Sequence, residues 1–271
     1  MQDQAVTRDA RPAWLPAWVS AGEPHGPGPR VLGTALAAIG AINLWRGDFT
    51  IVYHPMPDFL PGRALVAGLC NAALLATGTA IAIGRAWRPA ALGLTGVLVF
   101  LSLGWIVRVL LFPAMIGTWL GLAEQLALAI GALAVFAQGR TAPLALPAIC
   151  RIGFGLCQIV FALGHWLSLA ETIAMTPAYL PPGPRFWALA TGALHLAGGI
   201  LLLSGFRTVL VTRCLAAMFA AFGLLVWLPL LFGAPGAAVW AGNLINLALI
   251  GAVLAVGDAA RGRERESAAA L

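Results

Sequence analysis

The chain repeats itself at a fixed spacing of about 121 residues, and this repeat limits its fold more than any other feature. The repeated landmarks are tryptophans, prolines, glycines and a Leu-Leu-Phe triplet, which keep register to within one residue. A tandem duplication of one structural unit explains this order of landmarks. The matched landmarks are Trp45 and Trp166, Pro57 and Pro177, Gly84 and Gly205, Leu110–Phe112 and Leu230–Phe232, and Gly121 and Gly242.

The composition indicates that both units lie in a membrane. Hydrophobic residues make up 61% of the chain and charged residues 10%, and the mean hydropathy is +0.90. Soluble domains are roughly 45–50% apolar and about 25% charged, so a soluble fold would leave too much apolar surface in water. A helix needs ~20 apolar residues to cross ~30 Å of hydrocarbon. We therefore predict an all-α membrane protein with eight transmembrane helices in two pseudo-symmetric four-helix bundles.

Each unit supplies four of the predicted spans. We expect a flexible cytoplasmic tail over residues 1–29, a first repeat over 30–140, a second repeat over 141–258, and a cytoplasmic C-terminal tail over 259–271. Pro229 is expected to kink the seventh span near its end. The eight predicted spans are Val31–Trp45, Ala64–Gly84, Ala90–Phe112, Thr118–Ala137, Ala148–Ala170, Phe186–Ser204, Cys214–Phe232 and Ala237–Val256.

The positions of the arginines predict the orientation. The chain has sixteen basic residues, and all of them are arginine. With eight spans, twelve of these arginines fall on the side of the N-terminus, three fall on the opposite side, and Arg108 falls inside a span. Positively charged loops stay in the cytoplasm, so we expect a plasma-membrane protein with both termini inside. The same asymmetry explains the basic charge balance, and we expect no nucleic-acid partner because a basic soluble module is missing.

The four cysteines are scattered, without a CxxC pair, and are expected to be buried free thiols. The alternative is a dithiol redox pair, for which Cys150 and Cys157, seven residues apart, are the nearest candidates. The sequence contains no phosphate-binding loop, dinucleotide fingerprint, zinc-protease motif or nucleophile elbow. Whether the protein is an enzyme is left open by these observations.

Three segments of the second unit resemble the DoxX family of membrane proteins: Phe161–Trp166, Thr176–Pro181 and Thr191–Gly199. Their order is a helix, a Pro-rich loop and a Gly-rich helix. The corresponding segments of the first unit, Trp45–Phe49 and Pro55–Arg63, resemble the same pattern. The resemblance implies a fusion of two four-helix units and, for some relatives, a membrane subunit of a sulfur-compound:quinone oxidoreductase or a partner in a thiol-redox complex.

Two histidines within the spans form the first candidate site. His165 and His195 lie at similar depth on adjacent antiparallel helices, and Gln158 shares a helical stripe with His165. An ionisable group inside a bilayer needs a partner or a role. A ligand-binding or proton site is one interpretation, and structural hydrogen bonding is the other. Haem ligation is disfavoured because two imidazoles on one tight hairpin do not face each other across a macrocycle, and we predict no metal site.

Arg108 and Glu124 form the second candidate, on either side of the short connector at residues 113–117. The helices that they end and begin are expected to pack antiparallel, which would allow a charge-assisted ion pair. Such a pair could be structural, with Arg108 reaching outward as a variant, or part of an anion or proton site. At a spacing of 121 residues, each polar pair aligns with apolar residues in the other unit: the partners are Leu44, Leu74, Pro229 and Ile245.

Two long, Pro-rich loops on the extracytoplasmic side are expected to cap a site, although a rigid structural cap is the alternative. The candidate cap residues are Asp48, Asp58, Arg63, Glu171, Tyr179 and Arg185. The leading functional hypothesis is a membrane subunit that binds a lipophilic redox partner such as quinone, or a redox partner protein, on this side. The alternatives are a small-solute transporter and a non-catalytic membrane scaffold.

Overall fold

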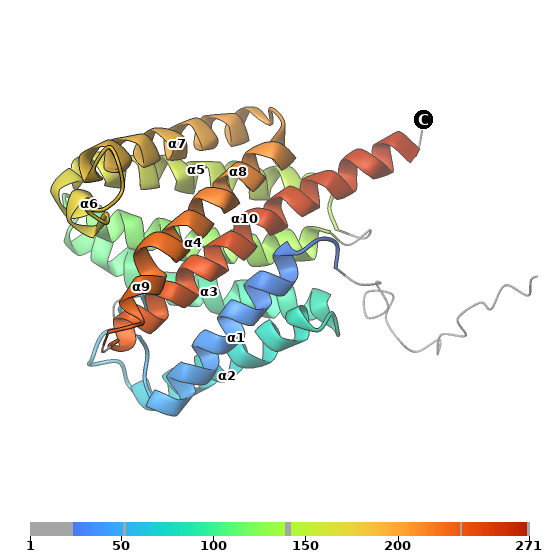
Figure 1. Ribbon diagram of the computed structural model, residues 1–271. Coiled ribbons are helices and arrows are strands. Elements are labelled where there is room, and N and C mark those ends of the chain that lie inside the picture. Colours follow the sequence, from blue (N-terminus) through green and yellow to red (C-terminus); the bar gives the residue numbers. More distant parts are fainter. Residues whose placement is uncertain (1–23, 51–52, 139–141, 234, 270–271) are drawn as a thin grey trace, which may run out of the picture.

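The computed structural model describes residues 24–50, 53–138, 142–233 and 235–269, and no β-strand occurs among them (Figure 1). The elements are α1 (Gly28–Arg46), α2 (Arg63–Ala82), α3 (Trp87–Leu111), α4 (Ile116–Ala137), α5 (Leu146–Leu167), α6 (Leu169–Met175), α7 (Pro184–Ser204), α8 (Thr208–Phe222), the π-helical turn η1 (Gly223–Trp227), α9 (Leu228–Leu230) and α10 (Ala237–Ala269).

Seven helical segments in the described part of the chain are long and apolar enough to cross a membrane. They are α2, α3, α4, α5, α7, the run from α8 to α9, and α10 up to Gly262. Helix α1, with 19 residues, is not among the seven. It carries Arg30 and Arg46 near its ends, and it packs between α2 and α10.

Two helices are interrupted where the sequence predicts continuous spans. The predicted fifth span continues to Ala170, whereas the structure ends α5 at Leu167 and begins α6 after Ser168. The seventh span is interrupted at η1, before Pro229 rather than at it. A proline lacks the N–H group that would bond to the carbonyl of the residue four positions before it, so it disturbs the turn that precedes it, and that turn overlaps η1.

The last predicted span ends at Val256, but α10 continues to Ala269 and so includes most of the predicted C-terminal tail, residues 259–271. Apolar composition ends where lipid ends, whereas Arg, Glu and Ala remain good helix formers in water. At the other end of the chain, residues 1–23 of the predicted N-terminal tail lie outside the described residues, and α1 begins at Gly28 within that predicted tail.

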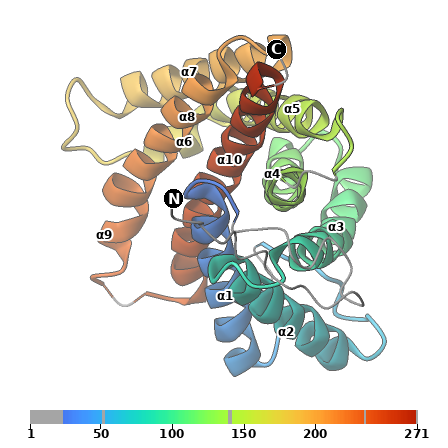
Figure 2. The same ribbon diagram turned by 90° about the vertical axis from the view of Figure 1, so that its right-hand side faces the viewer.

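Helices α1–α4 form the first half of the fold and α5–α10 the second. The two halves contact each other through their first and last helices. Helix α1 packs against α2 and also against α10 of the other half, while α5 packs against α7 and also against α4 (Figure 2). Helices α4 and α10 lie side by side at the centre. Each first helix is therefore covered by a helix from its own half and by the fourth helix of the other half.

Equivalent positions meet at this centre. A Cβ atom on Gly131 of α4 would lie 2.4 Å from the Cβ atom of Ala252 on α10, and the two residues are 121 positions apart. Two further close contacts are related by the same spacing. Leu32 of α1 contacts Gly251 of α10, and Gly153 of α5 contacts Ile130 of α4. The glycine is on the fourth helix in one contact and on the first helix in the other, so each contact accommodates one bulky side chain.

The backbone repeats as well. Left-handed φ angles occur at Gly84 and Gly205 (72° and 77°) and at the non-glycine positions Ala86 and Arg207 (47° and 43°). A positive φ is uncommon in a residue with a Cβ atom. Its occurrence at the same place in both turns, 121 residues apart, shows that the second and third helices of each half are joined by the same backbone conformation.

Candidate functional site

His165 and His195 come together as the sequence predicts. His165 lies in the last turn of α5 and His195 in the middle of α7. Their ring centroids are 5.0 Å apart, with 49° between the ring planes. His195 is buried and His165 is half-buried. The pair therefore lies inside the second half, close to the end where α5 passes into α6.

The partners of the two imidazoles define their tautomers. His195 Nδ1 lies 2.7 Å from Gln158 Oε1, and His165 Nδ1 lies 2.9 Å from the carbonyl oxygen of Phe161. Both partners are acceptors, so each Nδ1 carries the hydrogen of a neutral imidazole and each Nε2 keeps a lone pair. Gln158 is fully buried, and its Nε2 has no hydrogen-bond partner among the described residues. The site thus combines two acceptor nitrogens with one unused amide donor.

Three phenylalanine rings surround the pair. Phe161 contacts His195 edge-on, with ring centroids 5.5 Å apart. Phe219 of α8 lies 5.6 Å from the same imidazole, and Phe222 stacks on His165 at 6.2 Å with 20° between the planes. Aromatic rings exclude water and present flat faces, which suits a planar ring that hydrogen-bonds at its edges.

The π-helical turn η1 begins directly after Phe222 and corresponds to one extra residue in the second half. In α3, Trp105 comes seven positions after Leu98, and its ring packs on Gly121. In the second half, Trp227 comes eight positions after Phe219, and its ring packs on Gly242.

The extra residue lets Phe219 and Phe222 face the histidines while Trp227 keeps the packing of its counterpart. Single π-turns inside α-helices are frequently found at functional sites.

Side chains from α10 and from the loop after α6 hold this turn. Asn243 Nδ2 donates to the carbonyl oxygen of Trp227 at 3.0 Å, and Asn246 Nδ2 donates to that of Phe219 at 2.9 Å. The hydroxyl group of Tyr179 donates to the carbonyl oxygen of Leu225 at 3.3 Å. Tyr179, a predicted cap residue, therefore links the second long loop to the turn beside the histidines.

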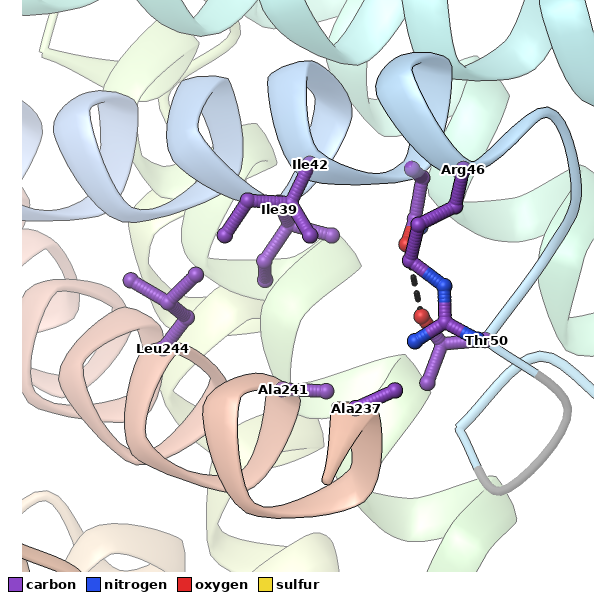
Figure 3. A pocket seen from close by; sticks show the side chains of 8 residues that line it. Ile39, Ile42, Arg46, Thr50, Ala237, Ala241 and Leu244 are labelled. Atoms are coloured by element: carbon purple, nitrogen blue, oxygen red, sulfur yellow. Dashed lines mark hydrogen bonds between the residues drawn. The ribbon is translucent and has the colours of Figure 1, made fainter. Parts of the chain in front are cut away.

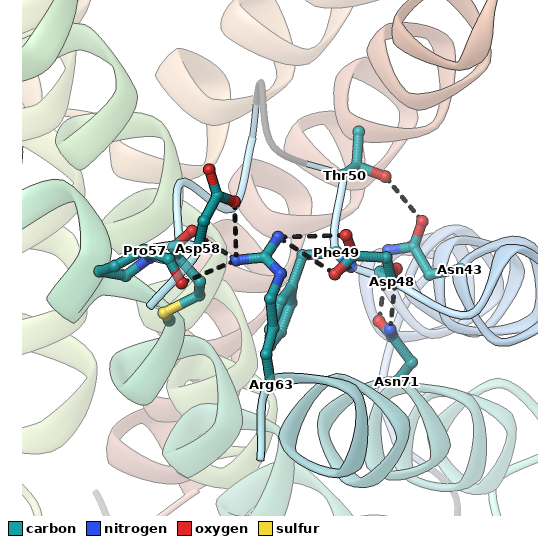
Figure 4. A network of polar contacts seen from close by, with 9 residues as sticks. Asn43, Asp48, Phe49, Thr50, Pro57, Asp58, Arg63 and Asn71 are labelled. Carbon is teal, nitrogen blue, oxygen red and sulfur yellow. Dashed lines mark hydrogen bonds and ion pairs between the residues drawn. The ribbon is translucent and has the colours of Figure 1, made fainter. Parts of the chain in front are cut away.

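The first long loop is held by a polar network in which Arg63 is central (Figure 4). The guanidinium group pairs with Asp48 at 3.1 Å and with Asp58 at 3.6 Å, and it donates to the carbonyl oxygens of Met56 and Pro57 at 2.6 and 2.9 Å. Three of the predicted cap residues are thus brought together, around backbone atoms of their own loop.

A buried amide chain extends this network into the bundle. Thr50 Oγ1 donates to Asn43 Oδ1 at 2.6 Å, and Asn43 Nδ2 donates to Asn71 Oδ1 at 3.2 Å. Asn71 Nδ2 lies 3.4 Å from the carbonyl oxygen of Asp48. The loop is therefore joined to both α1 and α2.

The other two predicted cap residues lie apart from this network. Glu171 and Arg185 are both exposed, and no ion pair joins either of them to the described part of the chain. The loop of the second half therefore contributes Tyr179, not a charged cap.

The predicted ion pair of Arg108 and Glu124 is wrong. Arg108 is exposed in the last turn of α3, and no salt bridge links it to Glu124. A long guanidinium side chain at a helix end reaches the polar interface and keeps its hydration, which outweighs one Coulomb contact. Glu124 instead lies close enough to Tyr53 for its charge to act on that phenol. Burial first, and the negative charge of Glu124 second, raise the pKa of Tyr53.

The residues that enter the bundle beside Glu124 are a second group that the sequence did not reveal. Trp105 Nε1 donates to the carbonyl oxygen of Tyr53 at 2.9 Å, and a Cβ atom on Gly104 would lie 2.9 Å from the carbonyl oxygen of Pro55. His54, between them, is buried, and its Nδ1 has no hydrogen-bond partner among the described residues. Burial lowers the pKa of His54 to about 4.

No group of three or more His, Cys, Asp and Glu side chains among the described residues is placed to hold a metal ion. All four cysteines are free thiols. Cys150 and Cys157 are buried and Cys70 is half-buried, whereas the predicted burial is wrong for Cys214, which is exposed.

Comparison with known proteins gives one match, over part of the second half of the chain. Residues 146–231 match the DoxX family model, and this stretch contains both histidines, the phenylalanine rings and η1. No curated protein and no solved structure matches the chain. With seven apolar helices of membrane-spanning length, the chain is a helical membrane protein, and its residues 146–231 are similar to the DoxX family.

Proposed function

We propose that the DoxX domain binds a lipophilic redox partner of the quinone class beside the His165–His195 pair. The observation that carries the proposal is the arrangement of hydrogen bonds at Nδ1 of both imidazoles, which leaves both Nε2 atoms as acceptors beside the unused Gln158 amide donor. A quinol hydroxyl group donates to an imidazole Nε2, and a quinone carbonyl oxygen accepts from an amide N–H group. The site offers both kinds of partner to one planar ring.

The proposal also accounts for the surroundings of the pair. Phe161, Phe219 and Phe222 supply apolar faces for the ring, and a membrane helix bundle gives access to a ligand dissolved in lipid. Oxidation of a quinol releases two protons and two electrons. In the proposal the imidazoles accept the protons, and a membrane redox partner protein accepts the electrons.

A binding experiment with a fluorescent or spin-labelled quinone analogue tests this function. The protein in detergent or nanodiscs is titrated as the parent and as His165→Leu and His195→Leu. Loss of one buried hydrogen bond is worth about 1–1.5 kcal/mol, so each variant should bind about tenfold more weakly. Arg108→Gln, at an exposed position in the other half, is the control and should bind like the parent. Equal affinity in all four proteins contradicts the proposal.

We further propose that α1 is an eighth span and that the chain consists of two DoxX-like repeats, residues 30–140 and 141–258. A helix of 19 residues is about 28 Å long, close to the ~30 Å of hydrocarbon. The exchanged contacts of α1 and α5, and the matched positive φ angles, support equivalent positions for the two first helices.

With eight spans, both termini lie on one side, and the distribution of arginines favours the cytoplasmic face of the plasma membrane. Reporter fusions after residue 60 and after residue 178 should both report an extracytoplasmic location, and fusions at residues 24 and 262 a cytoplasmic one. An extracytoplasmic signal at residue 24 contradicts the eighth span while leaving the quinone proposal intact.

A further inference from the structure

A shallow hollow lies between α1 and α10, at the end of the molecule where the residue 47–62 loop begins (Figure 3). It measures about 220 Å³ with its open mouth counted. Its floor consists of buried residues and its rim of more exposed ones. The lining residues are Ile39, Asn43, Thr50 and Ala241 on the floor, and Ile42, Arg46, Ala237 and Leu244 on the rim.

The other half shows why the hollow exists. In the equivalent contact between α5 and α4, Leu120 packs so closely on Gly164 that a Cβ atom on the glycine would lie 2.3 Å from the leucine side chain. The residues 121 positions away are Ala241, in place of Leu120, and Asn43, in place of Gly164. Alanine lacks the isobutyl group that fills this place in the contact between α4 and α5, so the α1–α10 contact retains open space.

The Arg46 guanidinium group lies at the mouth of the hollow. Arg46 is exposed, and no hydrogen bond or ion pair joins its guanidinium group to the described part of the chain. The neighbouring Asp48 is paired with Arg63, and the polar groups of Thr50 and Asn43 bond to each other. The charge of Arg46 is therefore available to an anion from outside the chain.

The position of the hollow favours a lipid as that outside molecule. Trp45, beside Arg46, is 88% exposed, as expected for a tryptophan at the level of lipid headgroups. An acyl chain is a single file of methylenes and needs less room than an α-helix with side chains, which is ~10 Å wide. Ile39, Ile42 and Leu244 supply the apolar walls that such a chain needs.

We propose that the hollow between α1 and α10 is a binding site for an anionic phospholipid. Its phosphate group pairs with the Arg46 guanidinium, and the first part of one acyl chain lies against Ile39, Ile42 and Leu244. This site is in the other half from the histidine pair and is independent of the quinone proposal.

Native mass spectrometry of the delipidated full chain tests the site. The protein is titrated with phosphatidylglycerol and, separately, with phosphatidylcholine. One arginine near a lipid surface is worth about 1 kcal/mol, so Arg46→Gln should weaken phosphatidylglycerol binding about fivefold and change phosphatidylcholine binding little. Arg185→Gln, which removes an exposed arginine at the corresponding end of the other half, is the matched control and should bind both lipids as the parent does.

A second variant tests the hollow itself. Ala241→Leu introduces the residue that fills the equivalent contact, and should weaken the binding of both lipids because the acyl chain is excluded. Ala237→Leu narrows the rim and serves the same purpose should Ala241→Leu fail to fold. Phosphatidylglycerol binding that is unchanged in Arg46→Gln, or unchanged in a folded hollow-filling variant, overturns the proposal.

Discussion

Gln125 and Asn246 perform the same task 121 residues apart. Gln125 Nε2 on α4 lies 3.5 Å from the carbonyl oxygen of Leu98, and Asn246 Nδ2 on α10 lies 2.9 Å from that of Phe219. Both acceptors are themselves separated by 121 residues, on α3 and α8. A side-chain amide therefore ties the fourth helix to the third in each half.

Because the Asn246 bond is shorter, its loss should cost more stability. Asn246→Leu is expected to lower the free energy of unfolding by about 1 kcal/mol, and Gln125→Leu by less. Unfolding in mixed micelles with increasing denaturing detergent measures both values. An equal or larger loss in Gln125→Leu would mean that hydrogen-bond length does not rank the two positions.

The contact between α4 and α10 should tolerate no larger residue at Gly131. A Cβ atom there would lie 2.4 Å from the Cβ atom and 2.6 Å from the Cα atom of Ala252, so the two helices must separate. Gly131→Ala should cost about 1–3 kcal/mol, as overpacking of a core usually does.

Gly96→Ala on α3 is its control, because no atom lies within 4 Å of the added methyl group. It should be neutral or stabilising by up to about 1 kcal/mol, as alanine is the better helix former. Comparable losses in both variants would show that helix–helix packing is not the cause.

Phe222 should matter for binding and little for folding. Its counterpart in the first half is Leu101, so Phe222→Leu introduces a residue that the fold already accepts at this position. Loss of the ring stacked on His165 should weaken the quinone analogue by about 0.5–1.5 kcal/mol, a factor of about 2 to 13. Phe232→Leu, at an 83% exposed ring, should leave the affinity unchanged. Titration of both variants with the quinone analogue measures these affinities, and equal affinities would contradict the role of the Phe222 ring.

Arg63 should not be replaceable by lysine. One guanidinium group bonds to Asp48 and to two carbonyl oxygens at once. The ammonium group of lysine ends a shorter side chain and lacks the planar set of N–H donors that these bonds use. Arg63→Lys is expected to loosen the loop by about 1–2 kcal/mol, seen as faster hydrogen exchange in peptides covering residues 47–62. Arg85→Lys, in an exposed turn at the other end, should leave that exchange rate unchanged.

The first loop should open at acidic pH. The pKa of His54 falls from its usual 6.5 to about 4 because the imidazole is buried, so the unfolded loop binds the proton more tightly than the folded one. The contribution of His54 to the free energy of unfolding of the loop is therefore complete above pH 6.5. It is lost progressively as the pH falls towards 4, by at most about 1.4 kcal/mol per pH unit. Hydrogen exchange in residues 53–62 should accelerate from pH 6.5 to 4.5, after correction for the intrinsic pH dependence. His54→Gln should remove this excess, and an excess that survives the substitution would assign it to another group.

The sequence predicted the histidine pair because depth can be counted along antiparallel helices. Counted along the predicted spans, His165 lies five residues before Ala170 and His195 nine residues after Phe186, which is a similar depth on antiparallel helices. The prediction for Arg108 and Glu124 used the same counting and was wrong. Counting does not show that a chain segment, Tyr53–Pro55, packs against α3 beside Glu124, or that the last turn of a helix lets a long side chain reach water.

The π-turn, Phe219, Phe222 and the buried position of His54 were not predicted, because their signal in the sequence is weaker. The Trp105–Trp227 spacing exceeds the Leu98–Phe219 spacing by one residue, and this slip in register marks the π-turn. No periodicity singles out Phe219 and Phe222, because phenylalanine is an ordinary core residue on an apolar helix. His54 was among the loop residues, but its burial depends on tertiary packing that the sequence pattern does not report.

The exchange of first and fourth helices has a consequence for biogenesis. During synthesis α1 emerges first, yet one of its two covering helices, α10, is completed last. Until then, the close-packing Gly28 and Leu32 on its surface have no α10 neighbour to meet. If α1 is the eighth span proposed above, it has to stay in place through more than 200 residues of elongation, and its release from the insertion machinery is expected to await the C-terminal helix.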